Sequence, residues 1–294
     1  MQTILVPLDL TAATEHTVVY ANKLAVRLHA EVVLLYCHPG AELTAAAEAG
    51  FRQRLSILAE RLRYVQLVRQ DGRRIRYRFV VRAGCLHDHV PAVIGEVGAD
   101  LLVLALEHTD CGEQAPDGNH AVRIAEQAPC PVLVVPAGPR PLPSRLVFTT
   151  DFGHVDAAAL PLLGELAHSL RAQLNLVHFY RRLDLPGLIS VKRGLRDTRE
   201  ALAGVPVDCK LVLEDDPLEG IGEFCARIGA QLLVYAPAET GPLRRFFDVC
   251  YTKTDAYHTR IPVLVLPRPA APAEAFCCQR CAQQAHPVAL AEAV

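Results

Sequence analysis

The chain has 294 residues, of which 51% are hydrophobic and 21% charged, and its formal net charge is −2. This composition is typical of a soluble globular protein, and the length is sufficient for two domains with separate cores. Because the net charge is small and no basic block occurs, we expect no sequence-independent binding of nucleic acid or of an anionic membrane.

The chain starts directly with a strand pattern, and no apolar run approaches the length of about 18 residues that a membrane span needs. We therefore expect neither an export signal nor a membrane anchor. Ten cysteines in such a chain indicate reduced thiols or metal ligands rather than disulfides. A cytoplasmic location follows as a prediction.

Short apolar runs rich in β-branched residues alternate with helical patterns along the first half. Runs that are apolar on both faces predict parallel strands covered by helices on each side. They lie at Thr3–Leu8, Val32–Tyr36, Ile75–Val81, Leu101–Leu106 and Val132–Val135. Between the first two runs, Thr14–Leu28 places apolar side chains on one face of a 3.6-residue period, which predicts a helix.

The second half repeats the first. The segment CPVLVVP at Cys130–Pro136 returns as IPVLVLP at Ile261–Pro267, and ILVPLD at Ile4–Asp9 aligns with LVFTTD at Leu146–Asp151. The offset between the copies is smaller at the end of the repeat than at its start, so the second copy is shorter between its second and third strands. One structural unit is therefore duplicated. Each copy predicts alternating strands and helices that form a doubly wound sheet.

The repeat boundaries divide the chain into four parts. These are a first repeat (residues 1–138), a linker (139–144), a second repeat (145–267) and a C-terminal tail (268–294). Prolines stiffen the linker region. In the tail, Cys277 precedes the pair Cys278 and Cys281, whose spacing suits a redox pair or half of a zinc knuckle. The alternative is a disordered tail with exposed thiols.

The strand endings resemble those of the universal stress protein family. The resemblance rests on ILVPLD followed by a helix, on GADLLVL at Gly98–Leu104 and on APCPVLVVP at Ala128–Pro136. It covers residues 1–138 and 144–267, so the chain resembles a tandem universal stress protein. The resemblance implies two doubly wound five-stranded parallel sheets of order 3-2-1-4-5, in an adenine-nucleotide alpha-hydrolase-like fold. It also implies pairing of the two repeats through their fifth strands, which in a tandem chain is internal.

A ligand site is expected where the strand order reverses, at the carboxyl ends of strands 1 and 4. In relatives that bind ATP, the aspartate that ends strand 1 faces the nucleotide, and a G-x2-G-x9-G-[S/T] stretch wraps the phosphates. The resemblance places these roles, with Gly84 after strand 3, on Asp9, Gly84, Ala105, His108, Gly118 and Asn119. The matching residues of the second repeat are Asp151, Ala236, Glu239, Val249 and Cys250.

The two repeats differ in this stretch. Glu239 and the Val249–Cys250 pair remove the phosphate cradle, so we expect no ATP binding in the second repeat. The first repeat keeps Gly118–Asn119 but lacks the two earlier glycines, which leaves ATP or AMP binding there as one hypothesis. The alternative is that Asp9 and Asp151 only cap the helix or loop that follows.

Histidines and a cysteine at the same sheet edge suggest a metal site as a further hypothesis. Imidazole and thiolate are ligands of Zn²⁺ and similar ions. The candidate ligands are His87, His89, His108, Cys111 and His120. The alternative is that solvent-exposed loops carry these residues without binding a metal.

Motifs of common hydrolases, P-loop proteins and metalloproteases do not occur in the sequence, so no chemical step is implied. We predict a non-catalytic stress-response binding or regulatory module with an unidentified protein partner. Its ligand site is diverged in the first repeat and degenerate in the second. Two alternatives are an ATP-binding universal stress protein with slow hydrolysis and a metal- or thiol-dependent redox sensor.

Overall fold

A computed structural model describes residues 2–40, 42–68, 74–106, 124–125, 127–153, 155, 160–236 and 260–267. The strands are β1 (Thr3–Pro7), β2 (Glu31–His38), β3 (Tyr77–Ala83), β4 (Leu101–Ala105), β5 (Val132–Val135), β6 (Arg145–Thr149), β7 (Gln173–Tyr180), β8 (Val207–Leu213), β9 (Leu232–Tyr235) and β10 (Val263–Val265). The helices are α1 (Ala12–Leu28), α2 (Ala45–Val68), α3 (Leu86–Val97), α5 (Leu160–Leu170), the 3-10 helix η2 (Arg182–Gly187), α6 (Leu188–Ala201) and α7 (Pro217–Ile228). Across these ranges, none of the helices has both the length and the apolar character needed to cross a bilayer.

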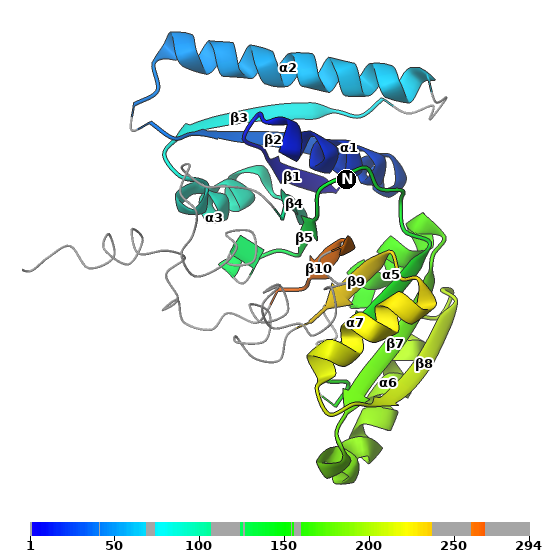
Figure 1. Cartoon of the computed structure of the whole chain (residues 1–294). Coiled ribbons are helices and arrows are strands. Elements are labelled where there is room, and N and C mark those ends of the chain that lie inside the picture. The colour runs from blue at the N-terminus through cyan, green and yellow to red at the C-terminus, as the bar shows by residue number, and fades with distance from the viewer. Residues whose placement is uncertain are drawn as a thin grey trace, which may run out of the picture.

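The strands form one sheet in the order β3-β2-β1-β4-β5-β10-β9-β6-β7-β8. Within each half all neighbouring strands are parallel, so the predicted α/β fold with a parallel sheet is confirmed. The halves meet where β5 and β10 pair antiparallel, with Leu133 opposite Leu264. This pairing joins the two five-stranded parallel sheets expected from the sequence into one continuous 10-stranded sheet (Figure 1). The reason is that the outermost strand of each half satisfies its unpaired backbone groups on the other.

Most elements begin and end within a few residues of the predicted positions. The helix predicted at Thr14–Leu28 is confirmed and begins at Ala12. It ends at His29, which adopts a left-handed conformation with φ 58° and donates its N–H to the Ala25 carbonyl. The strand at Val132–Val135 is confirmed without change.

Helices cover both faces of the sheet. Side chains from α1, α2, α5 and α6 join one hydrophobic cluster, and side chains from α3 and α7 join a second. Successive strand residues alternate between the clusters: Val32 and Leu34 belong to the first, and Val33 and Leu35 to the second. This alternation explains why the strands are unbroken apolar runs in the sequence, because neither face meets water.

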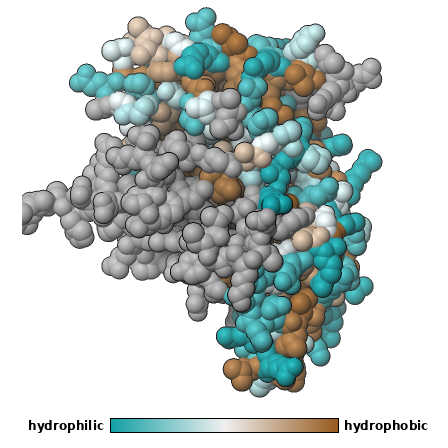
Figure 2. Space-filling view, in the orientation of Figure 1, coloured by the Kyte–Doolittle hydropathy of each residue, from teal (hydrophilic) through white to brown (hydrophobic). Residues whose placement is uncertain are grey.

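In the described ranges, the exposed large apolar side chains other than Leu213 at the end of β8 gather in two places. One group lies on α2 and includes Ile57, Tyr64 and Val65, and the other lies on η2 and the start of α6. Figure 2 shows these as brown surface at opposite ends of the molecule, where Figure 1 places α2 and η2–α6. The remaining surface in this view is largely polar.

Candidate functional site

Asp9 lies between the carboxyl end of β1 and the start of α1. Its Oδ1 accepts hydrogen bonds from the Thr11 N–H (2.9 Å), the Thr11 hydroxyl (2.6 Å) and the Thr14 hydroxyl (2.8 Å). Because Thr14 is buried, the bond also satisfies a hydroxyl that lacks access to water. The structure thus shows Asp9 organising the entry to α1, which is the capping alternative.

Leu10 lies between Asp9 and Thr11 in the chain and has a left-handed backbone conformation with φ 59°. The other non-glycine residues of positive φ in the described ranges, His29 and Arg171, lie at helix ends, where this conformation is common. Leu10 instead precedes a helix, and the conformation costs a side chain of this kind about 1 to 2 kcal/mol. Backbone strain of this kind is characteristic of functional loops.

The other described candidates lie along the same sheet edge at different distances from Asp9. Ala105 ends β4, which pairs directly with β1, and is 1% exposed. Gly84 follows β3 with φ 103° and donates its N–H to the His38 carbonyl at 2.8 Å, so it lies beside the end of β2. Of the described candidates, therefore, only Asp9 and Ala105 meet at the β1/β4 crevice. His108, Gly118 and Asn119 lie outside the described residues.

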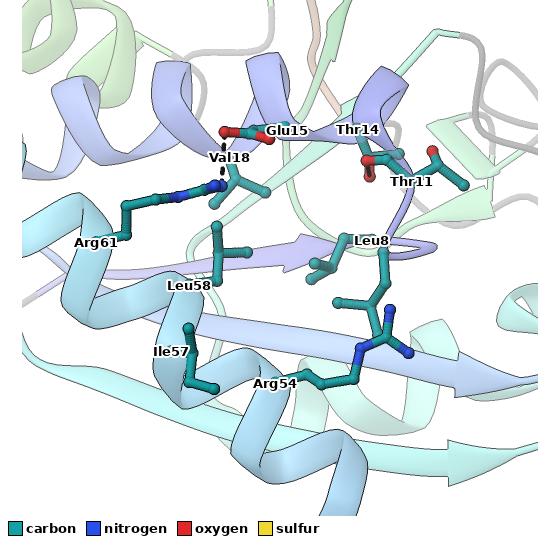
Figure 3. A pocket seen from close by; sticks show the side chains of 10 residues that line it. Leu8, Thr11, Thr14, Glu15, Val18, Arg54, Ile57, Leu58 and Arg61 are labelled. Atoms are coloured by element: carbon teal, nitrogen blue, oxygen red, sulfur yellow. Dashed lines mark hydrogen bonds and ion pairs between the residues drawn. The ribbon is translucent and has the colours of Figure 1, made fainter.

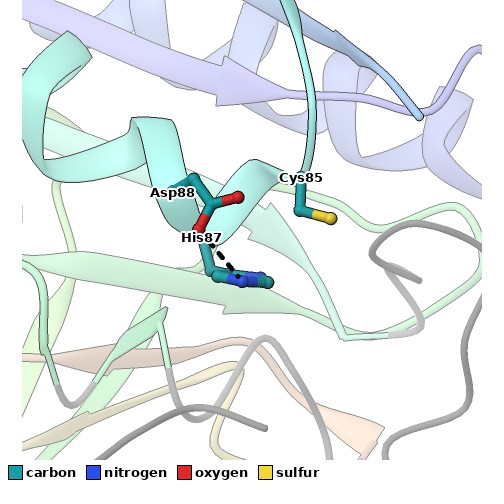
Figure 4. Close-up of side chains that lie close together, drawn as sticks. All are labelled: Cys85, His87 and Asp88. Atoms are coloured by element: carbon teal, nitrogen blue, oxygen red, sulfur yellow. Dashed lines mark ion pairs between the residues drawn. The ribbon is translucent and has the colours of Figure 1, made fainter. Parts of the chain in front are cut away.

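The two described metal-ligand candidates do not converge. A ring nitrogen of His89 lies 2.6 Å from the Ala83 carbonyl oxygen. His87 instead lies 3.3 Å from the Asp88 carboxylate, and Cys85 completes a group whose ligand atoms lie within 4.8 Å of one another (Figure 4). Two positions apart on a helix, His87 and His89 do not face each other. Cys111 and His120, like His108, lie outside the described residues.

Cys85 corrects one expectation from the sequence. It is disulfide-bonded, whereas the sequence favoured reduced thiols or ligands. Disulfide pairing depends on the distance between two Cα atoms, which spacing along the chain does not show. The other cysteines in the described ranges, Cys37, Cys130, Cys209 and Cys225, are not in disulfides. Burial raises the pKa of Cys130 to about 11, so this thiol is protonated at neutral pH.

The corresponding loop of the second half is filled by its own side chains. Asp151 again follows the first strand and accepts the Gly153 N–H at 2.9 Å. Phe152 between them is 1% exposed and packs edge-on against Phe148 (5.6 Å between ring centroids). At Gly194 in α6, a Cβ would lie 1.6 Å from the Phe152 carbonyl oxygen. Helix and loop are therefore in backbone contact, which leaves no room for a ligand between them.

The sequence analysis missed this contact and the strain at Leu10. Phe152 aligns with Leu10 in the same register that aligns Asp151 with Asp9, so the exchange of a leucine for an aromatic residue was visible. Gly194 lies inside a helical pattern. A glycine at such a position often has a packing reason, and this was the only sequence signal of the contact. Nothing in the sequence indicated the left-handed conformation of Leu10, because leucine rarely adopts it.

Comparison with known proteins agrees with this architecture. Residues 1–136 match the family model described as the Universal stress protein family. Among solved structures, a universal stress protein from Archaeoglobus fulgidus DSM 4304 has a TM-score of 0.62 at 13% identity and covers 90% of this chain and 96% of its own. A functionally unknown protein from Pseudomonas aeruginosa PAO1 has a TM-score of 0.56 at 17% identity, with 91% and 92% covered.

The cytoplasmic domain of a prokaryotic cation chloride cotransporter is also similar, with a TM-score of 0.50 at 13% identity and 90% and 95% covered. At such identities the likeness shows the fold alone. No curated protein matches the chain in sequence. Residues 1–136 thus match the universal stress protein family model, and the chain has the fold of universal stress proteins.

Proposed function

We propose that the chain is a tandem of two universal stress units that acts as a non-catalytic binding or regulatory module in a stress response. The family match over residues 1–136 supports the first unit. The sequence repeat and the order β8-β7-β6-β9-β10, which repeats β3-β2-β1-β4-β5, support the second. The division at residues 139–144 and the cytoplasmic location stay predictions from the sequence.

One observation carries the assignment of the ligand site to the first unit. The loop after β6 is closed by Phe152 and Gly194, whereas the loop after β1 holds a strained Leu10 and borders a pocket. We therefore propose a diverged ligand site at Asp9 and Ala105 and a degenerate one at Asp151 and Ala236.

Calorimetric titration of the full chain with ATP and with AMP tests this proposal. Because the first unit lacks two of the three family glycines, we expect no micromolar binding of either nucleotide. Micromolar binding that is lost in Asp9→Ala and retained in Asp151→Ala would instead establish the nucleotide-binding alternative. Release of inorganic phosphate from ATP would then show whether slow hydrolysis accompanies it.

A redox-dependent metal site is a second candidate function, favoured by the cluster around Cys85. After reduction of its disulfide, the Cys85 thiolate, His87 and Asp88 would offer three ligands, to which a water molecule adds a fourth. Elemental analysis after zinc loading should then find metal in the reduced protein and none in the oxidised protein. Equal zinc content in both, or none in either, would reject this candidate.

Oligomeric state follows from the pairing of β5 with β10. That contact occupies the strand edge through which single units are expected to pair, so we propose that the chain is a monomer. Size-exclusion chromatography with light scattering should give a mass near 32.1 kDa. A stable dimer would require a second interface.

A further inference from the structure

A pocket opens between α1 and α2 in the first half, on the face of the sheet that these helices cover (Figure 3). Its volume is about 320 Å³, and its apolar lining comes from Leu8, Leu10, Val18 and Leu58. Ile57 stands at the rim and is 62% exposed. A concave apolar surface with an exposed apolar rim is suited to binding a small apolar group.

Charged side chains at the rim divide into a paired and an unpaired set. Arg61 on α2 donates to Glu15 on α1 at 2.6 Å, and Figure 3 shows this ion pair bridging the helices. Arg54, two turns earlier on α2, has no carboxylate partner in the part of the chain that the structure describes. Its guanidinium lies 5.9 Å from the Phe51 ring centre. Within the described part of the chain, the pocket therefore combines an apolar interior with the positive charge of Arg54 at its rim.

The polar side chains of the loop hydrogen-bond to one another. The hydroxyls of Thr11 and Thr14 both donate to Asp9 and so hold that carboxylate in the helix entry. The Leu10 side chain reaches the pocket through the strained backbone described above. A strained conformation that places an apolar side chain in a pocket indicates a binding role for that loop.

The second half has the same elements without the opening. Buried Leu55 and Leu62 on α2 have the same spacing as buried Leu195 and Leu202, which align α6 with α2. In that alignment Arg54 corresponds to Gly194, and Gly194 is the residue in contact with the Phe152 backbone. The first half thus carries a positively charged arginine where the second half has the glycine that its loop contacts.

We propose that this pocket binds a small anionic amphiphile, a monocarboxylate with an unbranched apolar chain. The carboxylate would pair with Arg54, and the chain would lie between Val18 and Leu58. At about 30 Å³ per non-hydrogen atom, taken from the share of liquid volume per water molecule, the pocket accommodates about ten such atoms. Octanoate has this size. A cationic amphiphile would be repelled by the positive charge of Arg54, and a neutral amphiphile would form no ion pair with it.

Octanoate is the probe for the test, titrated into the full chain and followed by calorimetry and by backbone NMR shifts. Saturable binding is expected, with shifts concentrated at α1 and α2. Acetate, octylammonium and 1-octanol should each bind at least about tenfold more weakly than octanoate. Acetate lacks the long apolar chain, octylammonium carries a positive charge, and 1-octanol carries none.

Variants on the exposed side of α2 locate the site. Arg54→Gln should weaken octanoate binding about tenfold and leave 1-octanol unchanged, because only the ion pair is lost. Arg52→Gln removes the same charge two positions away, where Arg52 pairs with Glu48, and should leave octanoate binding unchanged. Ile57→Glu should weaken binding, and Ile57→Lys should not, since Ile57 is exposed in the folded chain.

Three results would overturn the proposal. These are no saturable octanoate binding, equal binding of acetate or octylammonium, and equal effects of Arg54→Gln and Arg52→Gln. Circular dichroism of each variant separates a lost site from a lost fold. The proposal does not rest on nucleotide binding, because the ATP titration probes the strand-end crevice and the octanoate titration probes the space between the helices.

Discussion

The loops after β1 and β6 occupy equivalent places in the two halves and are built differently. In the first half Leu10 adopts φ 59°, and a pocket remains between α1 and α2. In the second half Phe152 is buried, and α6 approaches so closely that only glycine fits at position 194. One half fills this space with its own side chains, and the other keeps an opening.

The comparison shows where a duplicated fold can diverge. The sheet cores of both halves contain the same kinds of side chain, with Leu5 and Val147 both fully buried in the same cluster. Such positions tolerate little change, because interiors are close-packed. The loops at strand ends contribute fewer side chains to the core. They can therefore change from a ligand site to a loop filled by its own side chains without loss of the fold.

The largest expected effect is that of Phe152→Ala. This substitution removes a buried aromatic ring that contacts Phe148 and His178, and should lower the free energy of unfolding by about 4 kcal/mol. Leu10→Ala is the matched change in the first half and should cost about 1 kcal/mol, because Leu10 is partly exposed. Urea denaturation measures both, and equal losses would contradict the contrast between a plugged and an open loop.

Gly194→Ala should be the next most damaging change. The added Cβ requires the Phe152 loop or α6 to move, which should cost about 3 kcal/mol. Gly95→Ala is the control: Gly95 lies in α3 with no atom within 4 Å of an added Cβ, so the helix should gain up to about 1 kcal/mol. If thermal denaturation finds the two variants alike, the backbone contact does not hold the second half closed.

Asp9→Ala should cost about 1 to 2 kcal/mol. The side chain accepts three hydrogen bonds at the entry to α1, and the buried Thr14 hydroxyl would lose one of them. Asp151→Ala breaks the bond to the Gly153 N–H and should cost less. A larger loss at Asp151 than at Asp9, measured by urea denaturation, would show that the second loop depends more on its carboxylate than the first loop does.

The smallest effect concerns a feature of the second half's core, the Cys225 thiol on α7. Complete burial raises its pKa from 9.0 to about 12. The unfolded chain therefore loses this proton at lower pH than the folded chain. The resulting stability is fully present below pH 9.0 and is lost as the pH rises toward 12.

Between pH 8 and pH 10, Cys225 should account for a loss of about 1 kcal/mol of stability. Cys225→Ala should remove that part of the pH dependence, measured by urea denaturation at each pH. Cys37→Ala, at a half-buried free thiol, is the control for the loss of a cysteine. An unchanged pH dependence in Cys225→Ala would show that the thiol is not buried as the structure places it.

Much of the fold could be predicted because its signals are local. The run at Val132–Val135 and the helix at Thr14–Leu28 were recognisable from the period of their apolar residues. The repeat then extended the same interpretation to β6–β10. Pairing of β5 with β10 was implied by the family resemblance alone, because it joins the end of one half to the end of the other and no local period shows it.

The candidate site could be predicted only in outline. Asp9 follows β1 and Ala105 ends β4, and these strands are neighbours in a parallel sheet; that the two residues hold a ligand stays a prediction. The disulfide at Cys85 and the separation of His87 from His89 depend on which atoms come together in space. Those distances are not encoded in the spacing of residues along the chain.

The order of elements and the placement of apolar residues on both faces of each strand were therefore already set by the amino-acid sequence. Periods of two and 3.6 residues act over a few neighbours and can be recognised directly. Whether the space between a strand-end loop and the next helix is open or filled was decided by tertiary packing. That outcome depends on a loop and a helix meeting across the fold, as Phe152 meets Gly194 in the second half, whereas Leu10 and Arg54 line a pocket in the first.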